Sequence, residues 1–196
     1  MVTAPPQSFG WSLPRGFLAF GRESAGAPDW AHEEARRLAA GAPSAEFERA
    51  LAETVDRCLA KPEQPDSWLA VVARPTPSTI ALVGSGWVTF GSLVDVEEIA
   101  AGWAAEYARE GAQPGEVLLV SSRRAPAVIA RDVVLGADED GRPAYVERGV
   151  IVKSFTRVGV TGMLSFSTRN LAAFEDLMHV LKDAVGDFQV QEATDG

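Results

Sequence analysis

Four strand-length segments follow one another in the second half of the chain, with only turn-length segments between them. They span Val117–Val120, Ala127–Leu135, Pro143–Thr156 and Val158–Ser167. The sequence Asp138-Glu139-Asp140-Gly141, between the second and the third, is typical of a hairpin turn. Because consecutive strands joined by tight turns pair antiparallel, this run predicts an antiparallel sheet at the centre of the fold.

The last of these segments alternates cleanly between apolar and polar side chains. Val160, Leu164 and Phe166 fall on one side, whereas Ser165 and Ser167 fall on the other. Such alternation is typical of a strand with one face on a core and one more polar face.

Helical periodicity appears on both sides of this run. One helix begins at Asp95, which forms a capping-box-like pair with Glu98, and Gly111 is expected to end it. Its apolar face consists of Val96, Ile99, Ala100, Trp103 and Tyr107. A second helix follows Asn170 and ends at Gly186, with a stripe made of Leu171, Phe174, Leu177, Met178, Leu181 and Val185. Two earlier helices are predicted over residues 28–40 and 44–59.

The remaining elements are short strands. Phe9–Phe20 is predicted as a strand, a tight turn at Leu13-Pro14-Arg15-Gly16 and a second strand or extended segment. Trp68–Arg74 is a further strand, and Thr79–Phe90 is a strand region interrupted at Gly84 and Gly86. We therefore expect an α/β (α+β) fold with a central twisted antiparallel sheet and helices packed on it. Residues 1–8 are a lead-in, 9–191 a single domain and 192–196 a tail.

Composition limits the classes of partner. With 27 acidic and 18 basic residues the net charge is −9, which disfavours general binding to nucleic acid or to anionic membranes. Cys58 is the single cysteine, so an intrachain disulfide is excluded. The first residues do not resemble a signal peptide, and no apolar stretch approaches membrane-spanning length. We expect a cytoplasmic protein.

Two short motifs carry a resemblance to a known superfamily. The opening, Phe9-Gly10-Trp11-Ser12-Leu13-Pro14-Arg15-Gly16-Phe17, resembles the start of PsbP-like domains. The strand end Leu164-Ser165-Phe166-Ser167-Thr168, followed by the final helix, resembles their close. This superfamily includes the photosystem II extrinsic subunit and the Ran-binding Mog proteins of yeast. The resemblance implies an α/β/α sandwich. It also implies a protein-binding role as an adaptor or chaperone, for which a bacterial secretion or assembly system is one setting.

The residues themselves form no catalytic or metal-binding motif that the sequence alone identifies. Gly84–Thr89 lacks the third glycine of a dinucleotide fingerprint and precedes a strand-like run, which favours a bulge or turn. The two histidines, His32 and His179, are too few for a typical zinc site, and no Gly-x-Ser-x-Gly elbow occurs. Cys58 lies on an apolar helical stripe. We expect no enzymatic activity, no cofactor and no metal.

Arginines and one tryptophan are the candidate partner-binding residues. Arg123 and Arg124 lie in a turn between two strands, and Arg131 and Arg148 lie inside strands. Arginine is favoured at interfaces because its guanidinium binds carboxylates through two hydrogen bonds. The alternative for Arg131 and Arg148 is ordinary cross-strand ion pairing with Asp132 or Glu147. Trp30, among charged residues on an early helix, is the candidate aromatic contact.

Three functions remain open at this point. The first is a non-enzymatic binding module for another protein. The second is a small-molecule-binding protein or enzyme with an apolar cleft between the sheet and the helices. The third is self-assembly into a homodimer through a sheet edge or a helix face.

Overall fold

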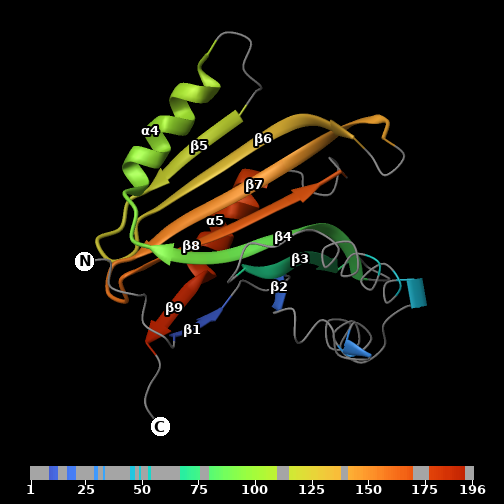
Figure 1. Ribbon diagram of the computed structural model, residues 1–196, viewed down its shortest axis with the longest axis horizontal. Helices are drawn as coiled ribbons and strands as arrows, with labels where there is room; N and C mark the ends of the chain where they lie inside the picture. Colours follow the sequence, from blue (N-terminus) through green and yellow to red (C-terminus); the bar gives the residue numbers. More distant parts are fainter. Residues whose placement is uncertain are drawn as a thin grey trace.

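A computed structural model shows the arrangement of the elements (Figure 1). The residues that it describes are 9–12, 17–20, 29, 30, 33, 45, 46, 49, 53, 67–75, 80–109, 115–137, 141–169 and 177–192.

A seven-stranded sheet forms the centre of the molecule, and every neighbouring pair of strands is antiparallel. Its order is β2-β3-β4-β8-β7-β6-β5. The strands are β2 (Phe17–Phe20), β3 (Ser67–Pro75), β4 (Ile80–Ser92), β5 (Gly115–Val120), β6 (Ala127–Ala137), β7 (Pro143–Phe155) and β8 (Val160–Thr168). The run β5–β8 meanders through the sheet as the tight turns predicted. The fold is therefore mixed α+β, with an antiparallel sheet and helices packed against it.

Two helices, α4 (Val96–Tyr107) and α5 (Leu177–Asp187), lie on opposite faces of this sheet. Val152 of β7 packs in one cluster with Val96 of α4. Its neighbour Ile151 packs in another cluster with Leu181 of α5. Successive side chains of a strand point to opposite faces, so the two helices cover different sides. In Figure 1, α5 lies behind the sheet and α4 lies at its β5 end.

The face under α5 carries the larger of the two hydrophobic clusters that the described residues form around the helices. The predicted stripe is confirmed at Leu177, Met178, Leu181 and Val185, all of which are buried. Phe188, directly after the helix, is fully buried, and its ring meets Phe155 edge-on at 5.6 Å between centroids. Burial of this much apolar surface makes a large contribution to the stability of the fold.

A buried lysine closes the end of α5. The Nζ of Lys153 donates to the carbonyl oxygens of Val185 and Phe188, each at 2.7 Å. The last carbonyls of a helix lack partners within the helix and carry its negative dipole end. The ammonium of Lys153 therefore satisfies the C-terminal end of α5 from inside the core.

The start of α4 is fixed by its cap and by the loop before it. Asp95 accepts hydrogen bonds from the backbone N–H groups of Glu97 and Glu98, at 2.9 and 3.3 Å, which confirms it as the N-cap. Ser154 donates to the Val94 carbonyl oxygen at 2.9 Å, and the Val94 N–H donates to Thr161 at 3.0 Å. These bonds tie the helix start to the β7–β8 hairpin, so that the predicted apolar face of α4 meets the sheet.

The opening strands are the clearest correction to the sequence-based prediction. We expected Phe9–Phe20 to fold as two strands around a tight turn, which suggests a hairpin. Instead, β1 (Phe9–Ser12) pairs antiparallel with β9 (Gln189–Glu192) in a separate two-stranded sheet, while β2 pairs with β3. The partner of β1 comes from the far end of the chain, and a local turn signal carries no information about such a partner.

The bulge or turn favoured at Gly84–Thr89 is confirmed as a bulge within one continuous strand, because the register between β3 and β4 shifts at Val72/Ala73, opposite Gly84. Two helix boundaries differ. Helix α4 ends at Tyr107 and is capped by Ala108, before Gly111. Helix α5 extends to Asp187, one residue past Gly186.

Several predicted features lie outside the described residues, wholly or in part. Trp30, Glu33, Ala45, Glu46, Arg49 and Glu53 are helical, in agreement with the two early helices. Outside lie Leu13–Gly16, His32, Cys58, Gly111, Asp138–Asp140, Leu171 and Phe174. In the described part of the chain, no helix is long and apolar enough to cross a membrane.

Candidate functional site

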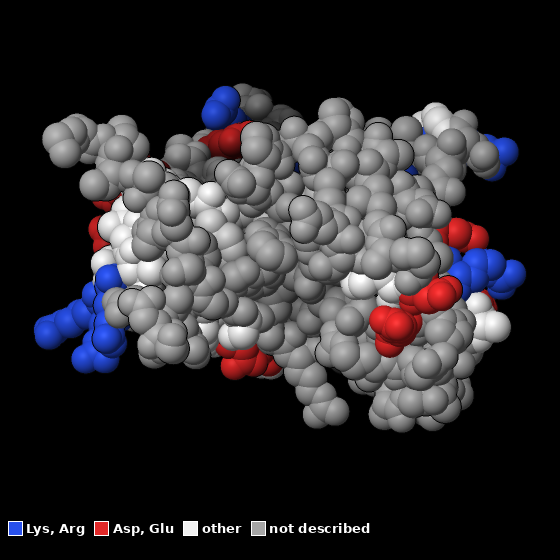
Figure 2. All heavy atoms as spheres, turned by 60° about the horizontal axis from the view of Figure 1, so that its bottom comes forward, with Lys and Arg blue, Asp and Glu red and all other residues white. Residues whose placement is uncertain are grey.

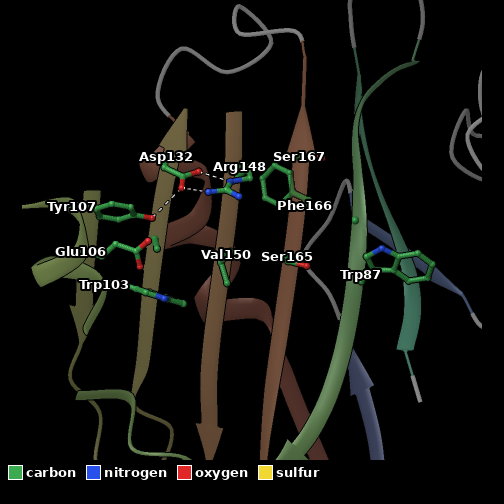
Figure 3. A pocket seen from close by; sticks show the side chains of 12 residues that line it. Trp87, Trp103, Glu106, Tyr107, Asp132, Arg148, Val150, Ser165, Phe166 and Ser167 are labelled. Atoms are coloured by element: carbon green, nitrogen blue, oxygen red, sulfur yellow. Dashed lines mark hydrogen bonds and ion pairs between the residues drawn. The ribbon is translucent and has the colours of Figure 1, made fainter. Parts of the chain in front are cut away.

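A groove of about 420 Å³ lies on the α4 face of the sheet (Figure 3). Helix α4 packs on β5, β6 and β7, and the groove opens beside it, over β7, β8 and β4. The residues that line it are Gly86, Trp87, Trp103, Glu106, Tyr107, Ala130, Asp132, Arg148, Val150, Ser165, Phe166 and Ser167. Pockets for small organic ligands span roughly 300–1,000 Å³, so this groove has the size of a binding site.

Strand register arranges the floor of the groove in two rows. Ser167 of β8, Arg148 of β7 and Asp132 of β6 are successive cross-strand partners and form a polar row. One step along the strands, Ser165 and Val150 are partners in a less polar row. Figure 3 shows the two rows side by side on neighbouring strands. A ligand in the groove would therefore meet polar groups at one end and apolar surface at the other.

Aromatic residues border this floor: Trp103 and Tyr107 stand on its α4 side, and Trp87 lies at its β4 side with its indole directed away from Val150 (Figure 3). Trp103 and Tyr107 come from the sheet-facing side of α4, and Trp87 comes from β4. All three are only partly buried. Indole and phenol rings offer an apolar body together with a polar hydrogen, which suits the walls of a site for an organic ligand.

An ion pair forms the polar end of the groove. The Nε of Arg148 donates to Oδ1 of Asp132 at 2.7 Å, and its Nη2 donates to Oδ2 of the same carboxylate. The Tyr107 hydroxyl donates to Oδ2 as well, at 3.3 Å. The partners differ in exposure: the Asp132 side chain is 7% exposed, whereas that of Arg148 is 51% exposed. The positive member of the pair therefore faces the groove.

Two of these groups have shifted protonation equilibria. The hydrogen bond to Asp132 raises the pKa of Arg148, so its guanidinium stays cationic at any physiological pH. Burial, followed by the negative charge of Asp132, raises the pKa of Tyr107 above its ordinary value of 10.0. Tyr107 is therefore a neutral hydrogen-bond donor in the groove.

Two glycines give the groove its shape. A Cβ at Gly115, the strand partner of Asp132, would lie 2.6 Å from the Tyr107 ring. The absent side chain is therefore what lets this ring lie over β5. A Cβ at Gly86 would lie 1.9 Å from the backbone oxygen of Ser165, so β4 and β8 approach closely only because residue 86 is glycine.

The candidate partner-binding arginines do not form one cluster. Arg148 belongs to the groove, whereas Arg131 lies on the α5 face, where it pairs with Glu147 at 2.7 Å and Glu116 at 3.0 Å. Both therefore make the cross-strand ion pairs expected as the alternative, with Asp132 and Glu147. A role for either one in binding a partner stays a prediction.

The other candidates lie apart from the groove. Arg123 and Arg124 are exposed in the turn between β5 and β6. Trp30 is partly buried on a helical segment. On the face shown in Figure 2, the coloured basic and acidic side chains of the described residues lie in separate small groups rather than in one basic patch.

His179 lies apart from the groove as well. Its side chain is exposed on α5, with Nε2 at 3.6 Å from Oδ2 of Asp183. Within the described ranges, no group of three or more His, Cys, Asp or Glu side chains is placed to hold a metal ion.

Sequence reasoning missed the groove because it assigned its members to other roles. Trp103 and Tyr107 were expected to be packing residues of a helix, and Ser165 and Ser167 the polar side of a strand. The polar alternation of β8 was the available signal, since it marked a sheet face that no apolar layer fully covers.

Comparison with known proteins identifies no relative. No family model matches the chain, and neither a curated protein nor a solved structure is significantly similar to it. The resemblance to PsbP-like domains therefore stays a prediction.

Proposed function

We propose that this chain is a non-enzymatic binding protein that holds a small organic molecule in the groove beside α4. The observation that carries the proposal is the groove itself: about 420 Å³, with aromatic walls and one polar end. Sites of this kind combine apolar lining with a few converging polar groups. This is the alternative that the sequence left open, a cleft between the sheet and a helix.

The fold supports this proposal at a finer level. We infer a three-layer α/β/α sandwich of the PsbP-like kind, because α4 and α5 pack on opposite faces of the sheet. In such an arrangement, the layer that only partly covers its face leaves room for a ligand. Here α4 is the partial layer.

Groove occupancy is testable by nuclear magnetic resonance with a library of small aromatic and aliphatic compounds. A true ligand shifts the indole N–H signals of Trp87 and Trp103, which are assigned from Trp87→Phe and Trp103→Phe. The variant Ser165→Phe places a ring on the groove floor and should abolish the shifts. Ser92→Phe makes the same change at an exposed strand end and should leave them intact. Binding that survives in Ser165→Phe, or no binder in the whole library, would rule the proposal out.

A second candidate function, binding of a protein partner, rests on a different observation. The β6–β7 hairpin continues beyond its neighbours, since β5 pairs only as far as Asp132 and β8 only as far as Glu147. On this extension the cross-strand partners Leu135 and Tyr145 are 59% and 62% exposed. Exposed apolar pairs on strands that lack a described neighbour are typical of contact surfaces.

Affinity capture from native extract separates this candidate from the first. Leu135→Ser with Tyr145→Ser should lose a stoichiometric protein partner if the hairpin binds it, and Arg123→Glu with Arg124→Glu should lose it if the β5–β6 turn does. A partner retained by both double variants would exclude both surfaces.

A further inference from the structure

The two members of the Arg148–Asp132 ion pair contribute unequally to the groove. Asp132 accepts from Arg148 twice and from Tyr107 once, and its side chain is almost fully buried. Its charge is therefore satisfied by the protein. The Arg148 side chain, by contrast, is half exposed, and its guanidinium uses only the Nε and Nη2 atoms on Asp132.

The free edge of this guanidinium is the strongest hydrogen-bond donor in the groove. A guanidinium carries five N–H groups in a rigid plane, and among the described residues none accepts from Nη1 of Arg148. Ser167, its direct cross-strand partner, adds a hydroxyl that likewise makes no hydrogen bond within the described part of the chain. A planar edge of N–H donors beside a hydroxyl matches the two oxygens of a carboxylate.

We propose that the groove binds an organic carboxylate, with its oxygens on Arg148 and Ser167 and its apolar body on Val150 beside Trp103. This inference rests on the proposed function, because it names the chemical class of the ligand in the same groove. The body of the ligand lies on the less polar row of the floor, one step along the strands from its head group.

One charge in the groove opposes this assignment. Glu106 of α4 lines the same groove, its negative charge contributes to the raised pKa of Arg148, and it would favour a cationic ligand. Its side chain is exposed, so water screens it and it can turn away from a bound anion. Arg148 is fixed in place by a bidentate bond to Asp132 and pays less conformational entropy to bind. The fixed charge therefore decides the sign of the ligand.

Three probes with one aromatic body test the sign directly. Indole-3-acetate, indole-3-acetamide and tryptamine present a carboxylate, a neutral amide and an ammonium, and calorimetry measures each dissociation constant. We expect indole-3-acetate to bind at least about tenfold more tightly than tryptamine, the scale of one hydrogen bond to a charged group. Its affinity should also fall at high salt, because the contact is between charges.

Variants assign the effect to the head-group residues. Arg148→Lys keeps the charge but loses the planar fork and should weaken indole-3-acetate by about tenfold. Ser167→Ala should weaken it less and leave tryptamine unchanged. The matched control is Arg131→Lys, which alters an ion pair of the same type between the same two strands on the opposite face and should change no affinity. Circular dichroism checks that each variant is folded. If Arg148→Lys does not fold, the affinity of Ser167→Ala for indole-3-acetate still tests the proposal.

The outcomes distinguish failure of the carboxylate assignment from failure of the proposed function. Suppose that tryptamine binds as tightly as indole-3-acetate or more tightly, and that Ser165→Phe abolishes binding. The groove is then a binding site, but Glu106 sets the charge of the ligand. This result overturns the assignment of the ligand as a carboxylate. Equal binding of all three probes overturns it too. If no probe and no library compound binds, the groove is not a ligand site and the proposed function fails with it.

Discussion

The two faces of the sheet carry the same kind of ion pair but differ in how closely they are packed. Each face carries an arginine–carboxylate pair between β6 and β7: Arg131 with Glu147 under α5, and Arg148 with Asp132 beside α4. Under α5 the core side chains Ile129, Ile151 and Leu164 are fully buried. On the other face, α4 packs mainly on β5, β6 and β7, and the floor residues Val150, Ser165 and Ser167 are only partly buried.

A cation on each face shows the same difference. Lys153, on the α5 face, is held by two backbone carbonyls at the end of a helix, and this contact holds the structure together. Arg148, on the α4 face, lines the groove, and about half of its side chain is exposed. A polar group whose bonds all serve the fold is structural, whereas one with donors left over at a concave surface is a candidate for binding.

The largest expected effect comes from removing the Phe188 ring on the α5 face of the sheet, here called the closed face. Phe188→Ala should lower the free energy of unfolding by about 3–5 kcal/mol, because it leaves a cavity in a fully packed core. Val150→Ala, on the groove floor, should cost about 1 kcal/mol, since its side chain is already partly exposed. Denaturant unfolding followed by circular dichroism measures both. Similar costs at the two positions would show that the faces do not differ in packing.

Removing either member of the groove ion pair should have unequal effects. Arg148→Met leaves the buried carboxylate of Asp132 with only Tyr107 as its partner and should cost about 3 kcal/mol. Asp132→Asn keeps an acceptor and leaves a guanidinium that water already reaches, so it should cost about 1 kcal/mol. Denaturant unfolding of the two single variants and the double variant, as a thermodynamic cycle, measures the coupling. A larger cost for Asp132→Asn would contradict the assigned exposure of the pair.

Local patterns along the chain predicted the closed face well. Tight turns predicted the antiparallel run β5–β8, and 3.6-residue periodicity predicted which sides of α4 and α5 face the sheet. These signals succeed because the interactions behind them act between residues close in sequence, and because burial selects one face of each element.

The α4 face, which carries the groove, depends on how distant parts of the chain are placed relative to one another, and local sequence patterns do not encode this. Trp103 and Tyr107 look like packing residues, and whether they pack or line a groove depends on how far α4 reaches across the sheet. That reach follows from the bond between Val94 and the β7–β8 hairpin, and from Gly115, which admits the Tyr107 ring. The pairing of β1 with β9 likewise joins residues that no turn signal connects. Long-range placement is therefore what separates the groove from the core.

The closed face should also respond to pH through Lys153. Burial lowers the pKa of this lysine below its ordinary value of 10.5, so between the lowered pKa and about 10.5 the unfolded chain binds more protons than the folded one. Stability contributed by Lys153 therefore rises with pH in that window. Lys153→Met should cost about 1–2 kcal/mol near neutral pH, since it leaves two buried carbonyls without a donor. Unfolding of both proteins at several pH values should show the cost growing toward pH 10.5, and a cost that shrinks would contradict the burial of a charged Lys153.

The groove should show the opposite pH dependence through Tyr107, with a smaller effect. Near neutral pH, Tyr107→Phe removes one hydrogen bond of 3.3 Å to Asp132 and should cost about 0.5–1 kcal/mol. Its raised pKa means that above pH 10.0 the unfolded chain releases the phenol proton while the folded protein keeps it. Stability contributed by Tyr107 is therefore lost as pH rises from 10.0 toward the raised value, and the cost of Tyr107→Phe should shrink there.

The chain has two tyrosines, so the Tyr145→Phe background leaves Tyr107 as the single phenol, and the ultraviolet absorbance of phenolate follows its ionisation directly. Occupation of the groove by a carboxylate should delay this ionisation further, because a second negative charge beside Tyr107 disfavours the phenolate. Ionisation at or below pH 10.0 would show that the ring does not lie over Gly115 against Asp132. The polar end of the groove would then lack the arrangement that buries Asp132 and turns Arg148 outward.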